Sequence, residues 1–185
     1  MSNLLVIGQT GTLGSYLQRQ LRGIPCNIRF HQAQSWKQLF TDNQIDTIIH
    51  TARCCRKTSP RRDYATMREE IIGMINILDY CNFNAHFIYI SSKTVLGITS
   101  ESEHWLTPES IFPTIQECIN GKHVNQAINL PNNAVIPQYT KKLSSEHEIY
   151  ANTKIACENL VKSRMKKYSI LRVWDILPYN ASSNK

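Results

Sequence analysis

The sequence has no long hydrophobic run and few acidic residues. No uncharged apolar stretch is long enough to span a bilayer, and the amino terminus leads directly into a short apolar run without a signal-peptide pattern. We therefore expect a cytoplasmic protein that has no membrane partner. An apolar content of 42% and a charged content of 19% exclude a disordered chain. At 185 residues the sequence suffices for one globular domain.

Metal-binding and disulfide patterns are also missing. The six cysteines form no C-x-x-C pair and stand at no metal-like spacing from histidine (Cys26, Cys54, Cys55, Cys81, Cys118 and Cys157). We predict reduced thiols that mostly act as small buried apolar side chains, and no bound metal. The adjacent Cys54 and Cys55 fall in a predicted loop, which makes them the candidates for a reactive thiol.

Basic residues outnumber acidic ones by 21 to 14, which gives a net charge of +7. This excess favours an anionic partner. Residues 53–62 hold the densest group, with Arg53, Arg56, Lys57, Arg61 and Arg62. A second group closes a predicted helix, where cations complement the helix dipole (Lys162, Arg164, Lys166 and Lys167). No aromatic residues interleave with these cations and no nucleic-acid-binding module is recognisable, so nucleic acid is not the expected partner.

A glycine-rich turn stands near the amino terminus between a predicted strand and a predicted helix. Residues 4–7 are uncharged and apolar, which is typical of a strand buried on both faces. Gly8, Gly11 and Gly14 follow, and apolar residues then recur at helical spacing (Leu13, Leu17 and Leu21). Glycines let the backbone approach a pyrophosphate, and the start of a helix offers N–H donors. The turn therefore predicts dinucleotide binding in preference to a purely structural turn.

This Gly-x-x-Gly-x-x-Gly spacing resembles the loop that opens the Rossmann domain of the short-chain dehydrogenase/reductase superfamily. The resemblance implies that the cofactor lies against six loop residues: Gly8, Thr10, Gly11, Thr12, Leu13 and Gly14. Residues 26–30 predict the second strand, after which Rossmann domains commonly carry an acidic residue that binds the adenosine ribose. Residues 31–34 contain no acid, so the choice between NAD and NADP stays open.

Residues 46–52, Asp-Thr-Ile-Ile-His-Thr-Ala, resemble the strand of extended short-chain dehydrogenases that ends beside the cofactor. Only a short helix is expected before this strand, over residues 35–41 with Ser35 as its N-cap. The resemblance places three residues at the cofactor: Thr51, Ala52 and Arg53. The basic loop that follows either binds a phosphate of the cofactor or of a nucleotide-sugar substrate, or is a solvated surface loop.

Two further stretches resemble the same superfamily. Helical spacing over residues 62–81 matches a long helix of the family, but Glu70 replaces its usual asparagine. A buried strand over residues 85–90 then leads into Ser91-Ser92-Lys93-Thr94-Val95-Leu96-Gly97, which resembles the family's Ser-Ser-x-x-Val-Tyr-Gly. Leu96 replaces the tyrosine of that signature. The resemblance puts Ser92 at the position of the catalytic serine or threonine.

Residues 98–143 lack this resemblance. They contain four prolines (Pro108, Pro113, Pro131 and Pro137), and Asn120-Gly121 between two apolar stretches predicts a hairpin turn. A long irregular segment inside a compact domain is usually functional or disordered. Trp105 and Phe112 favour burial, so we expect an insertion that serves as a lid or an oligomer contact.

The last part of the chain predicts a long helix with Ser144 as N-cap and a strand over residues 168–174. The helix carries Tyr150 and Lys154, whose spacing of four residues places them on one face. A tyrosine hydroxyl is a poor base at neutral pH, and a neighbouring ammonium group favours the phenolate. The resemblance implies that Tyr150 is the acid/base, that Lys154 also holds the nicotinamide ribose, and that Ser92 orients the substrate oxygen.

The order of these motifs resembles the NAD-dependent epimerase/dehydratase family of extended short-chain dehydrogenases over nearly the whole chain except residues 98–143. The resemblance implies an α/β fold, namely a Rossmann-like doubly wound parallel sheet with helices on both faces. We expect one domain over residues 1–185, with the insertion at about residues 98–143. The chain ends close to where extended members begin their substrate-binding lobe.

The resemblance implies an NAD- or NADP-dependent oxidoreductase or epimerase/dehydratase that acts on a nucleotide-activated sugar, with a possible homo-oligomer. The alternative is an NAD(P)-binding regulatory or scaffold subunit with reduced catalysis. The departures at Glu70 and Leu96 favour this alternative, whereas the presence of Ser92, Tyr150 and Lys154 opposes it. Fold alone does not decide between the two.

Overall fold

The structure, a computed structural model, describes residues 3–26, 28–29, 32–52, 63–98, 105–131 and 144–176. Its centre is a five-stranded sheet in the order β1-β2-β3-β6-β5, in which all neighbouring strands are parallel. The strands are β1 (Leu4–Ile7), β2 (Thr47–His50), β3 (His86–Ser92), β5 (Gln126–Leu130) and β6 (Lys167–Val173). A separate parallel pair joins β4 (Trp105–Leu106) to β7 (Asp175–Ile176).

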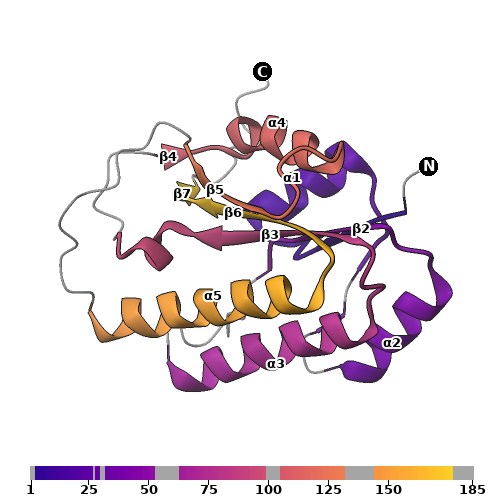
Figure 1. Cartoon of the computed structure of the whole chain (residues 1–185), viewed down its shortest axis with the longest axis horizontal. Coiled ribbons are helices and arrows are strands. Elements are labelled where there is room, and N and C mark those ends of the chain that lie inside the picture. Colours follow the sequence, from indigo (N-terminus) through magenta and orange to yellow (C-terminus); the bar gives the residue numbers. More distant parts are fainter. Residues whose placement is uncertain are drawn as a thin grey trace.

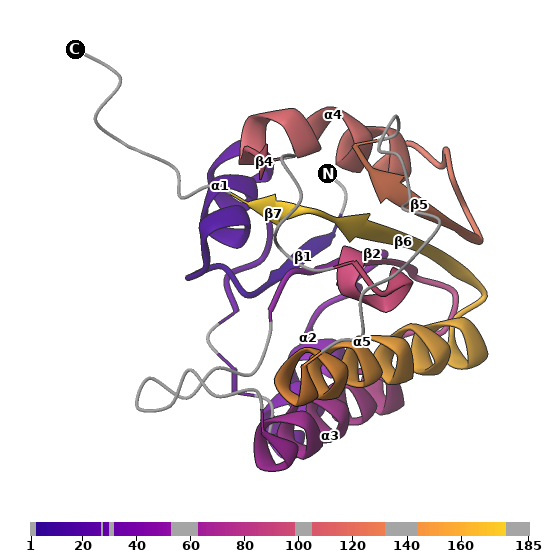
Figure 2. The ribbon, with the colours of Figure 1, turned by 90° about the vertical axis from the view of Figure 1, so that its left-hand side faces the viewer.

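Helices cover both faces of the sheet. The helices α1 (Thr12–Leu21) and α4 (Pro108–Ile119) lie on one face. The helices α2 (Ala33–Asp42), α3 (Tyr64–Tyr80) and α5 (Ser145–Arg164) lie on the other (Figures 1 and 2). A short 3₁₀ helix, η1 (Lys93–Leu96), follows β3. The predicted Rossmann-like, doubly wound α/β fold is confirmed.

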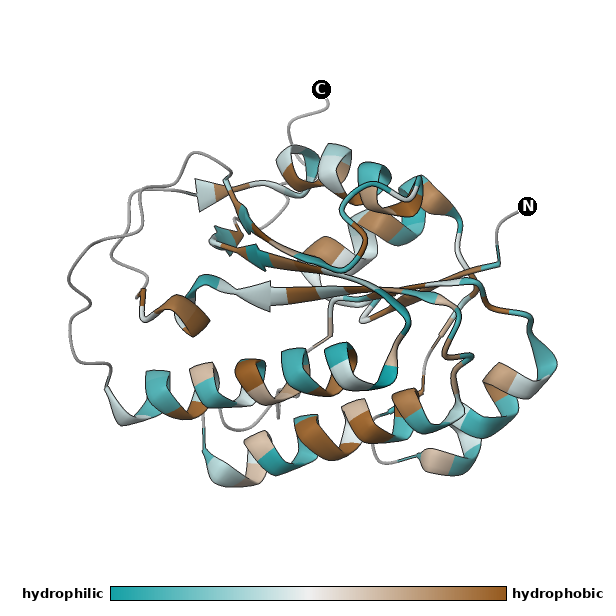
Figure 3. Ribbon diagram, viewed as in Figure 1, coloured by the Kyte–Doolittle hydropathy of each residue, from teal (hydrophilic) through white to brown (hydrophobic). Residues whose placement is uncertain are grey.

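Two hydrophobic cores follow from the alternation of side chains along the strands. Leu4 and Val6 pack with α1 and α4, whereas Leu5 and Ile7 pack with α2, α3 and α5. These four residues are at most 4% exposed, as expected for a strand between two helical layers. Figure 3 shows hydrophobic residues in the central strands and alternating with hydrophilic ones along α3 and α5. This alternation is what an amphipathic helix on a sheet requires.

The second strand predicted over residues 26–30 is not formed in the described residues. A single parallel bridge joins Ile24 to Leu5, with the Ile24 N–H donating to the Leu4 carbonyl at 2.7 Å. Pro25 follows and has no N–H to continue the ladder. The Cys26 N–H then donates to the Gln9 side chain at 3.3 Å instead of to β1. Among the residues that the structure describes, the chain thus pairs with the outer side of β1 at Ile24 alone.

Two local predictions are also wrong. The N-cap of α2 is Gln32 and not Ser35, because the helix begins at Ala33, two residues before that serine. The hairpin predicted at Asn120-Gly121 is a helix end, with Asn120 as the C-cap of α4 and Gly121 at φ +83°. The residues directly before this turn form the helix α4 and not a strand, and β5 beyond it runs parallel to β6. No hairpin therefore forms. By contrast, Ser144 is the N-cap of α5, as predicted.

Residues 105–131, the described stretch of the predicted insertion, form part of the sheet and of the helical layer that covers it. The residues of α4 that face the sheet, Ile111, Ile115 and Cys118, are fully buried, and β5 adds the edge strand next to β6. That the insertion serves as a lid or an oligomer contact stays a prediction. Residues 99–104 and 132–143 lie outside the described residues.

Candidate functional site

The candidate site lies where the parallel strands end. From β1 the chain crosses to the Ile24 bridge on one side, whereas β2 pairs with β1 on the other side. The carboxyl ends of β1 and β2 therefore form the point where the strand order reverses, at which doubly wound sheets bind ligands. The glycine loop follows β1, and Thr51 and Ala52 follow β2, so both predicted cofactor segments meet at this point.

Gly8 brings the two segments into contact. It adopts φ +93°, and a Cβ at this position would stand 2.7 Å from both the Ala52 nitrogen and the Thr51 Oγ1. Thr51 is itself fixed, because its N–H and its hydroxyl both donate to the Ile7 carbonyl at 2.9 Å. Only glycine satisfies both the positive φ and the close approach.

Gly14 and Gly11 have different surroundings. A Cβ on Gly14 would overlap the Gly8 carbonyl, so Gly14 allows α1 to pack against the loop backbone. Among the described residues, a Cβ on Gly11 would meet only the Gly8 carbonyl oxygen, at 3.5 Å. Gly11 is also the N-cap of α1 and provides no side-chain cap for the first N–H groups of the helix. The open space and the N–H groups at the start of α1 together fit the pyrophosphate of a dinucleotide.

The other predicted cofactor residues separate into exposed and buried ones. Thr10 and Thr12 are exposed at the loop surface, whereas the Leu13 side chain is 5% exposed and belongs to the core. Leu13 can therefore face a phosphate only through its backbone N–H. Arg53 and the rest of the basic loop, with the possibly reactive Cys54 and Cys55, lie outside the described residues. The four described cysteines, Cys26, Cys81, Cys118 and Cys157, are buried free thiols.

The two serines at the end of β3 have different roles. Ser91 is 2% exposed, and its hydroxyl donates to Glu158 Oε1 on α5 at 2.7 Å. Ser92 is half-buried and caps η1, accepting hydrogen bonds from the Thr94 N–H at 3.3 Å and the Thr94 hydroxyl at 3.1 Å. Ser91 is thus committed to the packing of α5, and Ser92 is the serine that lies nearer the surface.

Tyr150 and Lys154 lie together on α5, as predicted. The Lys154 Nζ is 5.7 Å from the centroid of the half-buried Tyr150 ring and 5.3 Å from that of Tyr89 in β3. Helix α5 packs against β3 and against η1, whose N-cap is Ser92. Tyr150, Lys154 and Ser92 therefore belong to neighbouring elements. The Lys154 ammonium group also forms an ion pair with Glu70 of α3, at 2.7 Å between Nζ and Oε1.

Charged groups hold the surrounding elements in place. Glu158 accepts from Arg172 Nε at 3.0 Å and Nη2 at 2.7 Å, in addition to Ser91, which links α5 to β3 and β6. Burial opposes its charged form, but these hydrogen bonds dominate and lower the pKa of Glu158. Lys93, whose side chain is 2% exposed, bonds Asp175 Oδ2 at 2.9 Å and so links η1 to β7.

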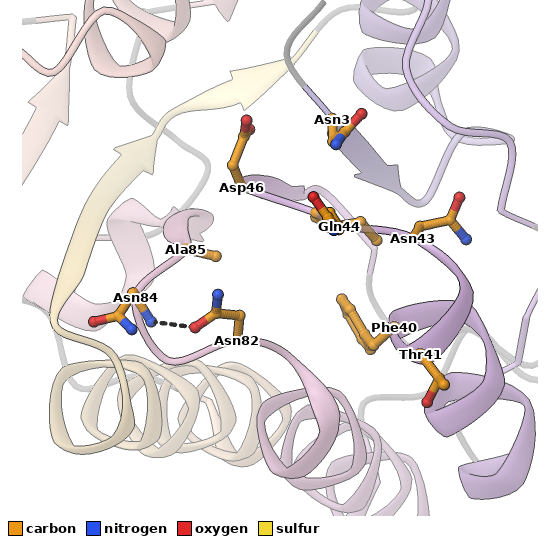
Figure 4. A pocket seen from close by; sticks show the side chains of 10 residues that line it. Asn3, Phe40, Thr41, Asn43, Gln44, Asp46, Asn82, Asn84 and Ala85 are labelled. Carbon is orange, nitrogen blue, oxygen red and sulfur yellow. Dashed lines mark hydrogen bonds between the residues drawn. The ribbon is translucent and has the colours of Figure 1, made fainter.

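A hollow of about 590 Å³ lies at the opposite edge of the sheet (Figure 4). It is lined by Asn3, Asp46 and Ala85, each of which directly precedes one of the first three sheet strands. The Asn84 N–H donates to the Asn82 Oδ1 at its rim, at 3.0 Å. The hollow therefore opens at the amino ends of the strands, away from the glycine loop, and is not part of the candidate site.

Three contacts of the site region were not predicted from the sequence. These are the ion pair of Lys154 with Glu70, the ion pair of Lys93 with Asp175, and the hydrogen bond from the Cys26 N–H to Gln9. The replacement of the family asparagine by Glu70 was the one available signal. No group of three or more potential metal ligands occurs among the described residues, and no helix among them is long and apolar enough to cross a membrane.

The fold and the glycine loop at its strand switch point define a dinucleotide-binding type of α/β domain. The family model described as "NAD dependent epimerase/dehydratase family" matches residues 4–183. The chain belongs to this family. No curated protein sequence matches the chain significantly.

Solved structures show the same fold at low sequence identity. The chain is similar to the dTDP-4-dehydrorhamnose reductase of Bacillus anthracis in complex with NADP, with TM-score 0.56 and 19% identity over 94% of this chain and 54% of that one. The chain is also similar to the enzyme WbmH of Bordetella bronchiseptica in complex with NAD⁺, with TM-score 0.58 and 15% identity over 94% of this chain and 56% of that one. It is similar as well to the UDP-glucose 4-epimerase of Thermotoga maritima with UDP-glucose, with TM-score 0.56 and 14% identity over 92% of this chain and 54% of that one. The chain thus spans about half the length of these structures.

Proposed function

We propose that this chain binds NAD or NADP and acts as an oxidoreductase or epimerase/dehydratase on a nucleotide-activated sugar. The observation that carries the proposal is the glycine loop at the strand switch point, where Gly8 lies against the Thr51 hydroxyl and the Ala52 backbone, and a Cβ on Gly11 would make only an ordinary contact within the described residues. Family membership supports it. So do the similar structures, which are a dTDP-4-dehydrorhamnose reductase with NADP, the enzyme WbmH with NAD⁺ and a UDP-glucose 4-epimerase with UDP-glucose.

The residues that would hold the cofactor follow from their positions. The Gly11 N–H is bonded to the Gly8 carbonyl at 3.0 Å, so the backbone N–H groups of Thr12, Leu13 and Gly14 at the start of α1 would face the pyrophosphate, with Thr51 and Ala52 at the adjacent strand end. Arg53 remains a proposed cofactor contact on the resemblance alone. The bound cofactor supplies the carrier for a hydride.

Three side chains carry the proposed proton chemistry. The Tyr150 hydroxyl exchanges a proton with the sugar hydroxyl, and Lys154, whose Nζ lies 5.7 Å from the centroid of its ring, would hold the cofactor ribose. The Ser92 hydroxyl orients the reacting oxygen of the substrate. Because Thr94 donates to Ser92 from both its N–H and its hydroxyl, the Ser92 oxygen has a fixed direction.

A second hypothesis is an NAD(P)-binding regulatory or scaffold subunit. One observation favours it: the Lys154 side chain is 4% exposed and is ion-paired with Glu70. An ammonium group held by a carboxylate perturbs a neighbouring tyrosine less than a free one, because the two charges cancel at a distance. The two hypotheses share the cofactor and differ in turnover.

Binding and turnover distinguish them. Calorimetry with NAD⁺, NADH, NADP⁺ and NADPH tests the shared part, and absorbance of the reduced nicotinamide follows turnover of a panel of sugar nucleotides. For the enzyme, Tyr150→Phe keeps the ring and the cofactor affinity but lowers turnover about 10²–10⁴-fold. Tyr168→Phe, the same change at a half-buried tyrosine on β6, is the control and leaves turnover unchanged. Binding without turnover of any substrate over a range of pH supports the scaffold.

A further inference from the structure

An exposed tryptophan stands at the carboxyl ends of the sheet strands. Trp105 in β4 is 56% exposed, although its size favours burial, whereas Trp36 and Trp174 are at most 3% exposed. The next residue, Leu106, is buried in the core and anchors the strand. The indole of Trp105 is therefore a large flat surface that faces water from a fixed strand, and such a surface can stack against a ring of a ligand.

A carboxylate lies beside this indole. Trp105 and Asp175 are directly paired in the parallel β4–β7 ladder, and the side chains of directly paired residues project to the same face of a sheet. The buried Lys93 holds Asp175, with 2.9 Å between Nζ and Oδ2, yet the Asp175 side chain remains 34% exposed. A flat ring and an accessible hydrogen-bond acceptor thus stand side by side.

This pair and the proposed acid/base lie on opposite sides of the same strand ends. Leu106 of β4 packs in the core that faces α1 and α4, whereas Tyr150 is on α5, over the other face of the sheet. The short helix η1 connects the two sides, because it packs against α5 and is joined to β7 through Lys93 (Figure 2). Ser92 caps this helix. An elongated ligand that crosses η1 can therefore place one end at Tyr150 and the other at Trp105.

We propose that Trp105 and Asp175 bind the base of the nucleotide-sugar substrate, with the indole stacked on the base and the carboxylate accepting one of its N–H groups. The inference rests on the proposed function, which puts the reacting sugar at Tyr150. In a nucleotide sugar the diphosphate and the ribose separate the sugar from the base, so the base lies away from the reacting carbon. A base offers a π face and N–H donors together, whereas a sugar has no π face.

Tryptophan emission tests the stacking, because Trp105 is the exposed one of the three tryptophans in the chain. UDP and dTDP are added to the full chain with its cofactor site saturated by NAD⁺ or NADP⁺, so that they do not bind in place of the cofactor. Both should quench the emission and protect Trp105 from acrylamide. Glucose 1-phosphate has a sugar and a phosphate but no base, and it should do neither. Quenching by glucose 1-phosphate as strong as that by UDP overturns the assignment to the base.

Calorimetry with UDP measures how much the indole contributes. Trp105→Leu removes the ring and should weaken binding about tenfold, whereas Trp105→Phe keeps an aromatic face and should stay within about threefold of the parent. Phe83→Leu is the matched control, because Phe83 is 51% exposed but precedes the amino end of β3, away from this site. It should leave the affinity for UDP unchanged. Circular dichroism and thermal melting show that the variants are folded, and the emission measurement on the parent needs no variant.

A modified probe tests Asp175 without disturbing its ion pair. UDP methylated at N3 of the uracil keeps the ring but lacks the one N–H of the base. We expect the parent to bind it about tenfold more weakly than UDP, because the carboxylate then has no donor to accept from. Equal affinity for the two probes overturns the role of Asp175.

The remaining outcomes separate this inference from the proposed function. Equal affinity of Trp105→Leu and the parent for both UDP and dTDP overturns this inference alone, because the cofactor and the proton chemistry need no contact with Trp105. A parent that binds NAD or NADP but neither base-bearing probe overturns the inference together with the nucleotide-sugar substrate. A parent that binds no cofactor either overturns the whole proposed function.

Discussion

Gly14 on α1 packs directly against the Gly8 carbonyl, so that a Cβ on Gly14 would overlap this oxygen. Gly8 in turn contacts the backbone of Ala52 at the end of β2. The first helix, the glycine loop and the second strand are therefore joined through backbone contacts at the candidate cofactor site. Of the three loop glycines, Gly8 and Gly14 are required by these backbone contacts, whereas a Cβ on Gly11 would make only an ordinary contact, at 3.5 Å from the Gly8 carbonyl oxygen, within the described residues.

Substitutions at Gly14 and Gly11 should therefore affect different properties, namely the stability of the fold and the binding of the dinucleotide. Gly14→Ala should lower the free energy of unfolding by about 1–3 kcal/mol, because the new methyl group forces α1 away from the loop. Gly11→Val should change it by less than about 1 kcal/mol but abolish dinucleotide binding. Denaturant unfolding and calorimetry measure the two effects. Equal cofactor affinity in Gly11→Val and the parent would remove the loop from the site.

Discrimination between NAD and NADP should be weak. The described residues after the Ile24 bridge, Cys26, Ile28 and Arg29, include no acid that could select the ribose hydroxyl. We expect the two dissociation constants to differ by less than about tenfold. The Arg29 carbonyl accepts from the Trp36 indole at 3.2 Å, so the backbone there is fixed. Arg29→Asp should then favour NAD, and a thousandfold preference for NAD in the parent would contradict this interpretation.

Breaking the Lys154–Glu70 pair should cost more than removing it. Lys154→Met removes the ammonium group that is ion-paired with the buried Glu70 carboxylate and should destabilise the fold by about 3–5 kcal/mol. Methionine at both positions should recover most of this loss, because neither charge of the pair then remains. A double-mutant cycle from urea unfolding measures the coupling. Additive losses would show that the two side chains act independently.

His50 should make the fold less stable in acid. Burial lowers its pKa from 6.5 to about 3, so below pH 6.5 the unfolded chain binds a proton that the folded chain does not. Stability should therefore fall as the pH falls from 6.5 to about 3, with a slope of up to about 1.4 kcal/mol per pH unit. His50→Phe can stack on Phe87 as the imidazole does and should flatten this dependence. The smaller contribution of His86, whose pKa burial also lowers, should persist in this variant.

Much of the fold could be predicted because local signals and tertiary packing agree. The apolar runs that became β1, β2 and β3 are buried on both faces, and the stripes of α1 and α3 face the sheet. The prediction of a second strand over residues 26–30 was wrong because Pro25 has no N–H to continue the pairing and the Cys26 N–H donates to the Gln9 side chain. The prediction of a hairpin at Asn120-Gly121 was wrong because these two residue types are favoured both in hairpin turns and at helix ends, and here a helix precedes them.

The sequence by itself determined the fold class, the glycine loop and the Tyr150–Lys154 face of α5, because each depends on spacing along one strand, turn or helix. Only the tertiary structure decided what lies against these residues. It placed Glu70 of α3 on Lys154, Thr51 and Ala52 on Gly8, and Asp175 on Lys93. These contacts join residues that are distant in the chain, and the positions of the elements in the packed layers bring them together. The charge of the Lys154 environment is therefore a property of the fold and not of the motif.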